Sequence, residues 1–273
     1  MTRNLKFWQV DSFAEEAFKG NPAVVFVLRE EIPDRLMQQI AIEMNQSETA
    51  FVLLRDSQNP LLRWFTPTFE IDLCGHATLA AAHIVFTEIY PDLSRITFDT
   101  KFVGPLAVDK QGNGPEARYT MDFPSRLGEK IDVATIPACV LEGLGTTARP
   151  VEAYKARDLM IVFENDQIIT DINPDFNALA KYDAFISVTA PSSDPRYDFV
   201  SRFFCADDGI SEDPVTGSAH CTLTPYWGMK KNKTRMTAYQ ASKRGGVLDL
   251  EIVGDRILIS GKAVTVIDGT LNV

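Results

Sequence analysis

Hydrophobic and polar residues alternate along short stretches over most of this chain, the pattern of strands that bury one face. The alternation is clearest at residues 248–260, where Gly254–Asp255 marks a turn between two such stretches. Residues 101–123 predict a second hairpin, with its tip at Gly112–Gly114. Because helical segments do not alternate regularly with these strands, the pattern favours mostly antiparallel sheet.

Helical periodicity is confined to a few segments. Apolar residues recur at intervals of four after Pro33, and a similar short helix is expected from Pro174 through Leu179. Residues 76–89 differ, because Ala, Leu, Ile, Val and Phe occupy every face of the expected helix. A helix that is apolar all round must be enclosed, which predicts a sheet curled around it. Pro225 should kink or end a further helix that begins near Thr216.

The sequence contains an internal repeat. "RWFTP…LCGHA" from Arg63 and "RFFCA…VTGSA" from Arg202 match in order, and "TAFVLL" from Thr49 resembles "DAFISV" from Asp183. The repeat predicts two similar halves, each a curled sheet around one helix. The boundaries expected are 1–115 for the first half, which the last strand (262–273) could complete, and 116–261 for the second.

Composition narrows the class of protein. The chain has 273 residues, of which 45% are hydrophobic and 23% charged, as in soluble globular proteins. A net charge of -10 argues against a nucleic-acid or anionic-membrane surface. The N-terminal segment resembles no signal peptide, and no apolar run is long enough to span a bilayer. Four cysteines without a CxxC pair favour reduced thiols in a cytoplasmic protein.

Two helix starts carry groups that can bind an anion. Cys74-Gly75-His76 and Thr216-Gly217-Ser218 each place a small residue where backbone N–H groups are unpaired and the helix dipole is positive. Alone, each motif also fits a structural role, in which Thr216 caps its helix and Gly75 relieves crowding. Their repetition at equivalent places favours a shared site for a small carboxylate.

Two acidic residues and three histidines complete the candidates. "NQSETAFV" places Glu48 at the entry to an apolar strand, and "EDPVTG" places Asp213 just before the second helix. Taken alone, Glu48 also fits a solvated residue and Asp213 a turn. His83 is expected to be a hydrogen-bonded core residue, and the role of His220 stays open. Since no histidine pair has the spacing of a zinc protease, no metal is expected.

Four motifs together resemble the PhzF family of phenazine-biosynthesis-like proteins, which has the diaminopimelate-epimerase-like fold. They are "VDSFAEEAFKGNPAVV" (10–25), "NQSETAFV" (45–52), "FTPTFEIDLCGHATLAAAH" (65–83) and "EDPVTGSAHC" (212–221). The resemblance covers nearly the whole chain. It implies an α+β fold of two similar halves, each a mostly antiparallel barrel-like sheet wrapped around a central helix, with the active site in the cleft between them.

The resemblance also implies an activity. It identifies Glu48 as the catalytic acid/base of a cofactor-independent isomerase, which moves a proton within a small unsaturated carboxylate. Homodimers and biosynthetic roles are typical of the family. The substrate-binding residues that it implies, with backbone N–H groups from the two glycines, are Gly75, His76, Asp213, Gly217 and Ser218.

Two other functions stay open. In diaminopimelate epimerase and proline racemase, more distant relatives of the family, paired cysteines at these helix starts invert a stereocentre. Here Cys74 is present, but its partner position holds Thr216, whose hydroxyl is a poor base. Both residues could instead line the site. A protein that binds a metabolite without converting it would have the same sequence features.

Overall fold

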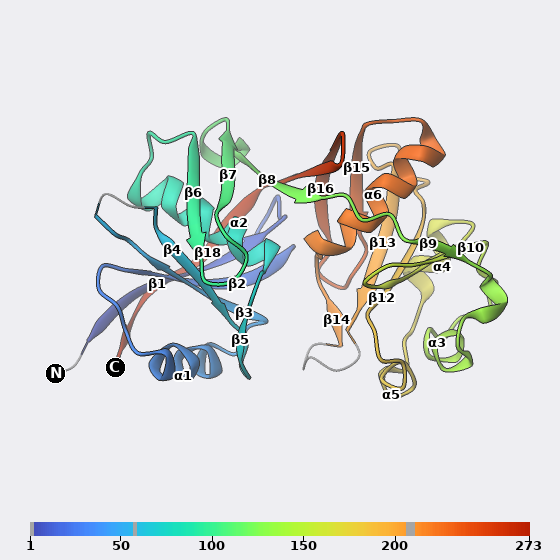
Figure 1. The fold of residues 1–273 in the computed structure, drawn as a ribbon, viewed down its shortest axis with the longest axis horizontal. Coiled ribbons are helices and arrows are strands. Elements are labelled where there is room, and N and C mark those ends of the chain that lie inside the picture. The colour runs from blue at the N-terminus through green and yellow to red at the C-terminus, as the bar shows by residue number, and fades with distance from the viewer. Residues whose placement is uncertain (1–2, 57–58, 206–210) are drawn as a thin grey trace. The chain divides into compact units, whose positions relative to one another are not determined.

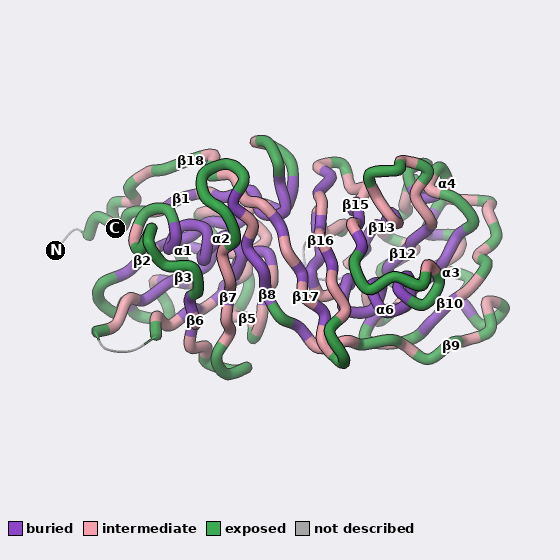
Figure 2. Tube along the Cα trace, turned by 90° about the horizontal axis from the view of Figure 1, so that it is seen from above, coloured by how far each residue is buried: buried purple, intermediate pink, exposed green. Residues whose placement is uncertain are grey.

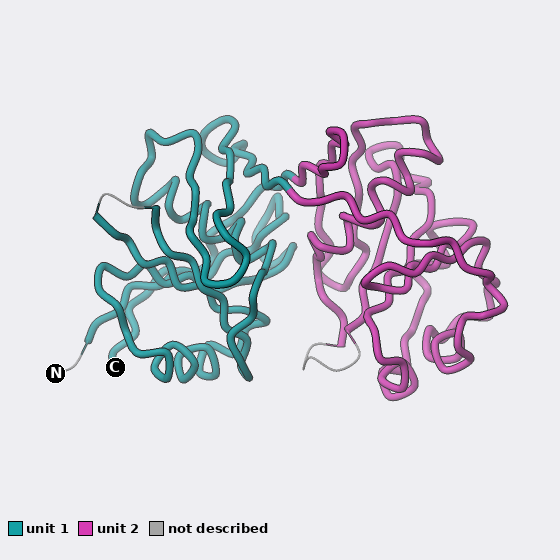
Figure 3. Tube along the Cα trace, viewed as in Figure 1, with its two compact units in different colours: residues 1–122, 260–273 teal, residues 123–259 magenta. Residues whose placement is uncertain are grey.

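The protein has a mixed α+β fold, as the sequence predicts. A computed structural model describes residues 3–56, 59–205 and 211–273. They form two compact units: unit 1 comprises residues 1–122 and 260–273, and unit 2 comprises residues 123–259 (Figure 3). The last strand therefore belongs to unit 1, together with the N-terminal part of the chain.

Unit 1 is built on one curled, mixed sheet. From one edge its strands run β18, β1, β2, β3, β4, β6, β7 and β8, with the two-residue β5 also paired to β4. The bounds are β1 (Asn4–Ser12), β2 (Asn21–Leu28), β3 (Glu48–Leu53), β4 (Leu61–Phe65), β5 (Glu70–Ile71), β6 (Arg95–Thr100), β7 (Leu106–Gln111), β8 (Arg118–Pro124) and β18 (Ala263–Asn272). Two pairs, β2–β3 and β4–β6, are parallel.

The central helix of unit 1 is enclosed, as its all-apolar surface predicts. The helices are α1 (Asp34–Met44) and α2 (Gly75–Ile84), with a π-helical turn at Val85–Ile89 and a 3-10 turn at Gly114–Glu116. Every residue of α2 from His76 to Ile84 is buried. Figure 1 shows α2 among the strands of unit 1, and Figure 2 shows how much of this region is buried.

Unit 2 repeats this arrangement strand by strand. Its strands are β9 (Glu129–Ile131), β10 (Glu152–Lys155), β11 (Leu159–Val162), β12 (Ile186–Pro191), β13 (Phe199–Phe204), β14 (Glu212–Asp213), β15 (Arg235–Gln240), β16 (Gly246–Val253) and β17 (Arg256–Gly261). As in unit 1, two pairs are parallel, β11–β12 and β13–β15. The sheets are thus more mixed than the sequence pattern suggested, because helical crossovers join the parallel strands.

The helices of unit 2 are mostly short. They are α3 (Ala138–Gly143), α4 (Asp166–Asp171), α5 (Phe176–Leu179) and α6 (Gly217–Lys231), with a 3-10 turn at Val133–Thr135. Throughout the described ranges, no helix combines the length and apolar character needed to cross a membrane.

Pro225 does not end α6, which continues for six more residues to Lys231. Proline has no N–H, so the carbonyl oxygen of Cys221, four residues earlier, loses its helical donor. The backbone N–H of Arg126 replaces it at 2.9 Å. A neighbouring segment thereby compensates for the proline, which the sequence did not reveal.

Strand register shows which parts of the repeat are equivalent. Phe65 lies opposite Thr49 and Phe204 lies opposite Ile186, so the "RWF" and "RFF" strings occupy matching places. By the same register Thr49 matches Ile186, not Asp183. The proposed alignment of "TAFVLL" with "DAFISV" is therefore wrong by three residues. The two strings share an Ala-Phe pair, but these pairs do not occupy equivalent positions in the strands.

Candidate active site

Glu48 is the first residue of β3, paired with the buried Ala23 of the parallel strand β2. Its side chain is 15% exposed, and its Oε2 lies 3.1 Å from Nε2 of His76. Both atoms are buried, but their geometry is not that of a hydrogen bond. In the described part of the chain, neither atom has another hydrogen-bond partner. A small rotation would complete the bond, as catalytic contacts often tighten when a substrate binds.

His76 lies in the first turn of α2 with a buried imidazole. Its Nδ1 is 3.1 Å from Nδ2 of Asn21 and 3.5 Å from Sγ of Cys74. Burial disfavours a charged ring, but Cys74 and the Glu48 carboxylate outweigh it and raise the pKa of His76 well above its usual range. The raised pKa therefore favours a protonated His76 ring beside Glu48.

Cys74 is the N-cap residue of α2, although its side chain makes no capping bond. Burial, and to a lesser extent the Glu48 carboxylate, raise the pKa of its thiol to about 11. Since the thiolate is the reactive form, Cys74 is a neutral, inert thiol near neutral pH.

The three side chains of Glu48, Cys74 and His76 also offer donor types that zinc accepts, within 4.8 Å of one another. The imidazole, however, turns different nitrogens to its neighbours: Nδ1 to Cys74 and Nε2 to Glu48. One ion could not bind all three without a rotation of the ring, so we assign no metal to this cluster.

The start of α6 in unit 2 has different chemistry. The hydroxyl of Thr216 donates to Oδ2 of Asp213 at 2.5 Å and makes no capping bond to the helix. Gln240 accepts from the Thr216 backbone N–H at 2.8 Å and donates to the Asp213 carbonyl at 2.7 Å. The capping role considered for Thr216 is therefore wrong, because its side chain binds a carboxylate instead.

Gly217 and Ser218 form the first turn of α6. A Cβ at Gly217 would meet no atom within 4 Å. Nη2 of Arg157 donates to Oγ of Ser218 at 2.8 Å, and the guanidinium lies 5.2 Å from the ring centre of Phe185. A cation thus accompanies the hydroxyl at this helix start.

The structure therefore gathers the predicted residues in two groups. Glu48, Cys74, Gly75 and His76 lie together in unit 1, and Asp213, Thr216, Gly217 and Ser218 lie together in unit 2. Sequence reasoning missed the supporting side chains, which are Ser12, Asn21, Arg157 and Gln240. For Asn21 a signal existed, since it belongs to the "GNPAVV" part of the first motif.

The two other histidines are buried structural residues. His83 contacts the Tyr119 hydroxyl at 2.8 Å and the Thr265 hydroxyl at 2.9 Å, which confirms the hydrogen-bonded core role expected for it. His220 lies 2.8 Å from the carbonyl oxygen of Thr216 through its Nδ1. Burial lowers the pKa of each to about 4, so both are neutral at ordinary pH.

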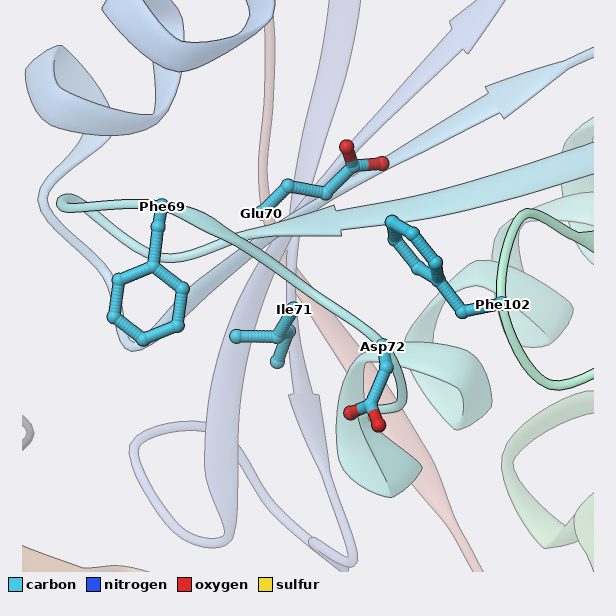
Figure 4. Close-up of a pocket in the computed structure, with 5 residues that line it drawn as sticks. All are labelled: Phe69, Glu70, Ile71, Asp72 and Phe102. Carbon is cyan, nitrogen blue, oxygen red and sulfur yellow. The ribbon is translucent and has the colours of Figure 1, made fainter.

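A hollow of about 370 Å³ lies on the segment that leads into α2. Figure 4 shows Phe69 and Phe102 on either side of Ile71 and Asp72, with Glu70 completing the lining. Both phenylalanines are more than half exposed. The hollow is separate from Glu48 and His76, which do not line it.

Comparisons with known proteins establish the family. The family model described as phenazine biosynthesis-like protein (PhzC-PhzF) matches residues 10–269, so the chain belongs to this family. An uncharacterized isomerase from Halalkalibacterium halodurans is 45% identical over 266 residues, 96% of each chain. The resemblance stated from the motifs is thereby confirmed.

Solved structures agree with the fold. A PhzF-family protein from Enterococcus faecalis has a TM-score of 0.91 at 44% identity, covering 98% of this chain and 99% of its own. A predicted epimerase from Pseudomonas aeruginosa, at 21% identity, shares the fold alone with a TM-score of 0.74, covering 98% and 99%. The predicted epimerase-like fold of two similar halves is confirmed.

Proposed function

We propose that this protein is a cofactor-independent isomerase that uses Glu48 as its acid/base. The class, an isomerase, is supported by the names of relatives at 41–45% identity. The observation that carries the assignment to Glu48 is the short distance between its carboxylate and Nε2 of His76 in a buried setting. A carboxylate held in this way can accept a proton from carbon and return it.

The reaction balances without a co-reactant. Glu48 removes a proton from one carbon of a small unsaturated carboxylate, and the electron pair moves along the conjugated system. The same carboxyl group then returns the proton to a second carbon, so a double bond migrates and the enzyme is regenerated. Gly75, His76, Asp213, Gly217 and Ser218 are proposed to bind the substrate, the glycines through backbone N–H groups.

A mechanism based on Cys74 has less support. Its thiol has a pKa of about 11, and the equivalent residue Thr216 donates its hydroxyl to Asp213. Neither the Cys74 thiol nor the Thr216 hydroxyl is therefore a base that could remove a proton from carbon.

The test is deuterium incorporation followed by NMR in D2O, with a panel of unsaturated cyclic and amino carboxylates. Wild type should catalyse exchange or double-bond migration, and Glu48→Gln should reduce the rate at least about 1,000-fold, because an amide is not a base. Cys74→Ser is the matched control and should retain most of the activity. Exchange that survives in Glu48→Gln but disappears in Cys74→Ser would revive the cysteine mechanism.

A panel compound that binds tightly without exchange would instead favour a metabolite-binding protein. The resemblance also leads us to propose a cytoplasmic, biosynthetic role and a homodimer. Sedimentation of the purified chain at two concentrations tests the dimer directly.

A further inference from the structure

Two fully buried polar residues contact His76. Ser12 and Asn21 face each other at the paired ends of β1 and β2, and both are 0% exposed. Ser12 donates its hydroxyl to the His76 carbonyl oxygen at 2.7 Å. Nδ2 of Asn21 lies 3.1 Å from Nδ1 of the His76 ring. One residue thus contacts the backbone of His76 and the other its imidazole.

The loop between these strands is shaped to bring the two residues together. Gly20, just before Asn21, has a φ of +64°, and a Cβ there would lie 2.1 Å from the Ser12 carbonyl oxygen. Only glycine fits this close approach of two backbone segments. The Gly-Asn sequence therefore combines the turn and the amide in adjacent positions.

The contact restricts where the imidazole carries its proton. With the NH2 group of Asn21 toward the ring, Nδ1 of a neutral His76 presents its lone pair and Nε2 carries the proton. In a charged imidazole both nitrogens carry protons, and Asn21, turned about its last torsion, can accept with its carbonyl oxygen. The remaining form, with a bare Nε2, would set a lone pair 3.1 Å from the Glu48 carboxylate.

We propose that Asn21 is a positioning residue that keeps a proton on Nε2 of His76, directed at Glu48. His76 then serves Glu48 as a hydrogen-bond donor and does not act as a second base. The functional meaning of this inference rests on the proposed role of Glu48, but the proton position itself does not.

The consequence for catalysis concerns the path of the proton. A nitrogen that already carries a proton cannot relieve Glu48 of the one taken from the substrate. The proton therefore stays on Glu48 until it returns to carbon, as a one-base isomerisation requires.

The test is long-range ¹H–¹⁵N NMR of the full chain labelled at its histidines, which needs no substrate. Wild type should show a protonated Nε2 on His76 at every pH from about 6 to 9. His83 and His220, which stay neutral there, provide internal references, and His76→Gln assigns the signal. A neutral His76 with its proton on Nδ1 would overturn the proposal.

Variants make the assignment to Asn21 specific. Asn21→Leu should make the Nδ1–H tautomer detectable at the high end of this pH range, where the ring loses its charge, although the Glu48 carboxylate still disfavours a bare Nε2. Asn21→Asp should keep Nδ1 protonated and extend the charged form of His76 upward by at least about one pH unit. Ser12→Ala, which removes a buried hydroxyl from the same strand pair without touching the ring, should leave the tautomer unchanged.

An unchanged His76 spectrum in folded Asn21→Leu and Asn21→Asp would refute the role of Asn21. If Asn21→Leu does not fold, the isosteric Asn21→Asp and the wild-type spectrum decide the matter. An Nε2–H form without Glu48-dependent exchange would separate this inference from the proposed function, since the first would stand and the second would fail.

Discussion

The two units share the same arrangement of strands around a buried helix, here called the frame, but differ in the side chains at the start of that helix. In unit 1, Arg63 donates two hydrogen bonds to Glu70, at 2.6 and 2.8 Å. In unit 2, Arg202 makes the same two bonds to Glu212, at 2.7 and 2.9 Å. Each pair joins the central strand to the short strand that leads into the buried helix. Both units therefore contain the same arginine–glutamate pair, which fixes the position of the helix start.

The groups at the helix starts have diverged. By strand register, the position of Glu48 corresponds to Phe185, one residue before the matching pair of Thr49 and Ile186. The position of His76 corresponds to Ser218, because each lies six residues after its paired glutamate, Glu70 or Glu212. Unit 1 therefore presents a carboxylate and an imidazole, whereas unit 2 presents a hydroxyl with a guanidinium. At these two matched positions only unit 1 has a carboxylate, whereas the neighbouring carboxylate of unit 2, Asp213, accepts a hydrogen bond from Thr216.

The largest expected effect tests the shared frame. Arg202→Met should lower the free energy of unfolding by about 3–5 kcal/mol, because it leaves a partly buried Glu212 unpaired. It also removes the donor to the carbonyl oxygens of Ile169 and Ile172. Arg63→Met should cost less, about 1–3 kcal/mol, since Lys101 still binds Glu70 at 2.8 Å. Urea unfolding measures both, and equal losses would contradict this difference.

Much of the frame was predictable from sequence, but its register was not. The all-apolar segment after His76 predicted an enclosed helix, because burial on every face leaves no alternative. The crossovers and the Cys221–Arg126 bond depend on segments far apart in the chain, so no local pattern indicates them. For the site, motif resemblance located Glu48 and His76, but the contacts of Asn21 and Arg157 required the folded strands.

The next prediction compares the buried histidines of the two core helices. The pKa of His83 and His220 is about 4 in the folded protein and about 6.5 when unfolded. Their stabilising contribution is therefore complete above pH 6.5 and is lost as the pH falls toward 4. The full loss is about 3 kcal/mol per histidine.

The two losses should be nearly equal although the histidines have different partners. Both His83 nitrogens face hydroxyls, whereas Nε2 of His220 has no hydrogen-bond partner in the described residues. Burial nevertheless lowers the pKa of each to about 4. Unfolding free energies at about pH 7 and 4.5 should therefore show a similarly weakened pH dependence in His83→Gln and His220→Gln. An unchanged pH dependence in either variant would contradict the buried, neutral state of that histidine.

Cysteine reactivity provides a kinetic test of the two units. Burial raises the pKa of Cys74 in unit 1 and of Cys221 in unit 2 to about 11. At about pH 8 each should react with iodoacetamide about 100-fold more slowly than an ordinary thiol. Mass spectrometry of the folded chain, with the half-buried Cys139 as reference, measures the rates. Fast alkylation of Cys74 alone would indicate an activated thiol and strengthen the epimerase alternative.

The smallest change in stability should be the most informative about binding. Gly217 begins α6, has no positive φ, and has open space where a Cβ would project. Gly217→Ala should therefore change the free energy of unfolding by less than about 1 kcal/mol. If the Gly217 N–H binds a substrate carboxylate, the added methyl group would obstruct that approach, and KM for a substrate found by the exchange assay should rise.

Gly254→Ala is the matched control for this last change. Its Cβ would also meet no atom within 4 Å, but Gly254 lies in the β16–β17 turn with a φ of +60°. The variant should lose about 1 kcal/mol through backbone strain and leave KM unchanged. A KM effect in Gly217→Ala without a stability effect, beside the opposite result in Gly254→Ala, would separate a ligand contact from a folding constraint. Unchanged KM in Gly217→Ala would remove this glycine from the proposed carboxylate site and leave Asp213 and Ser218 as the proposed binding residues of unit 2.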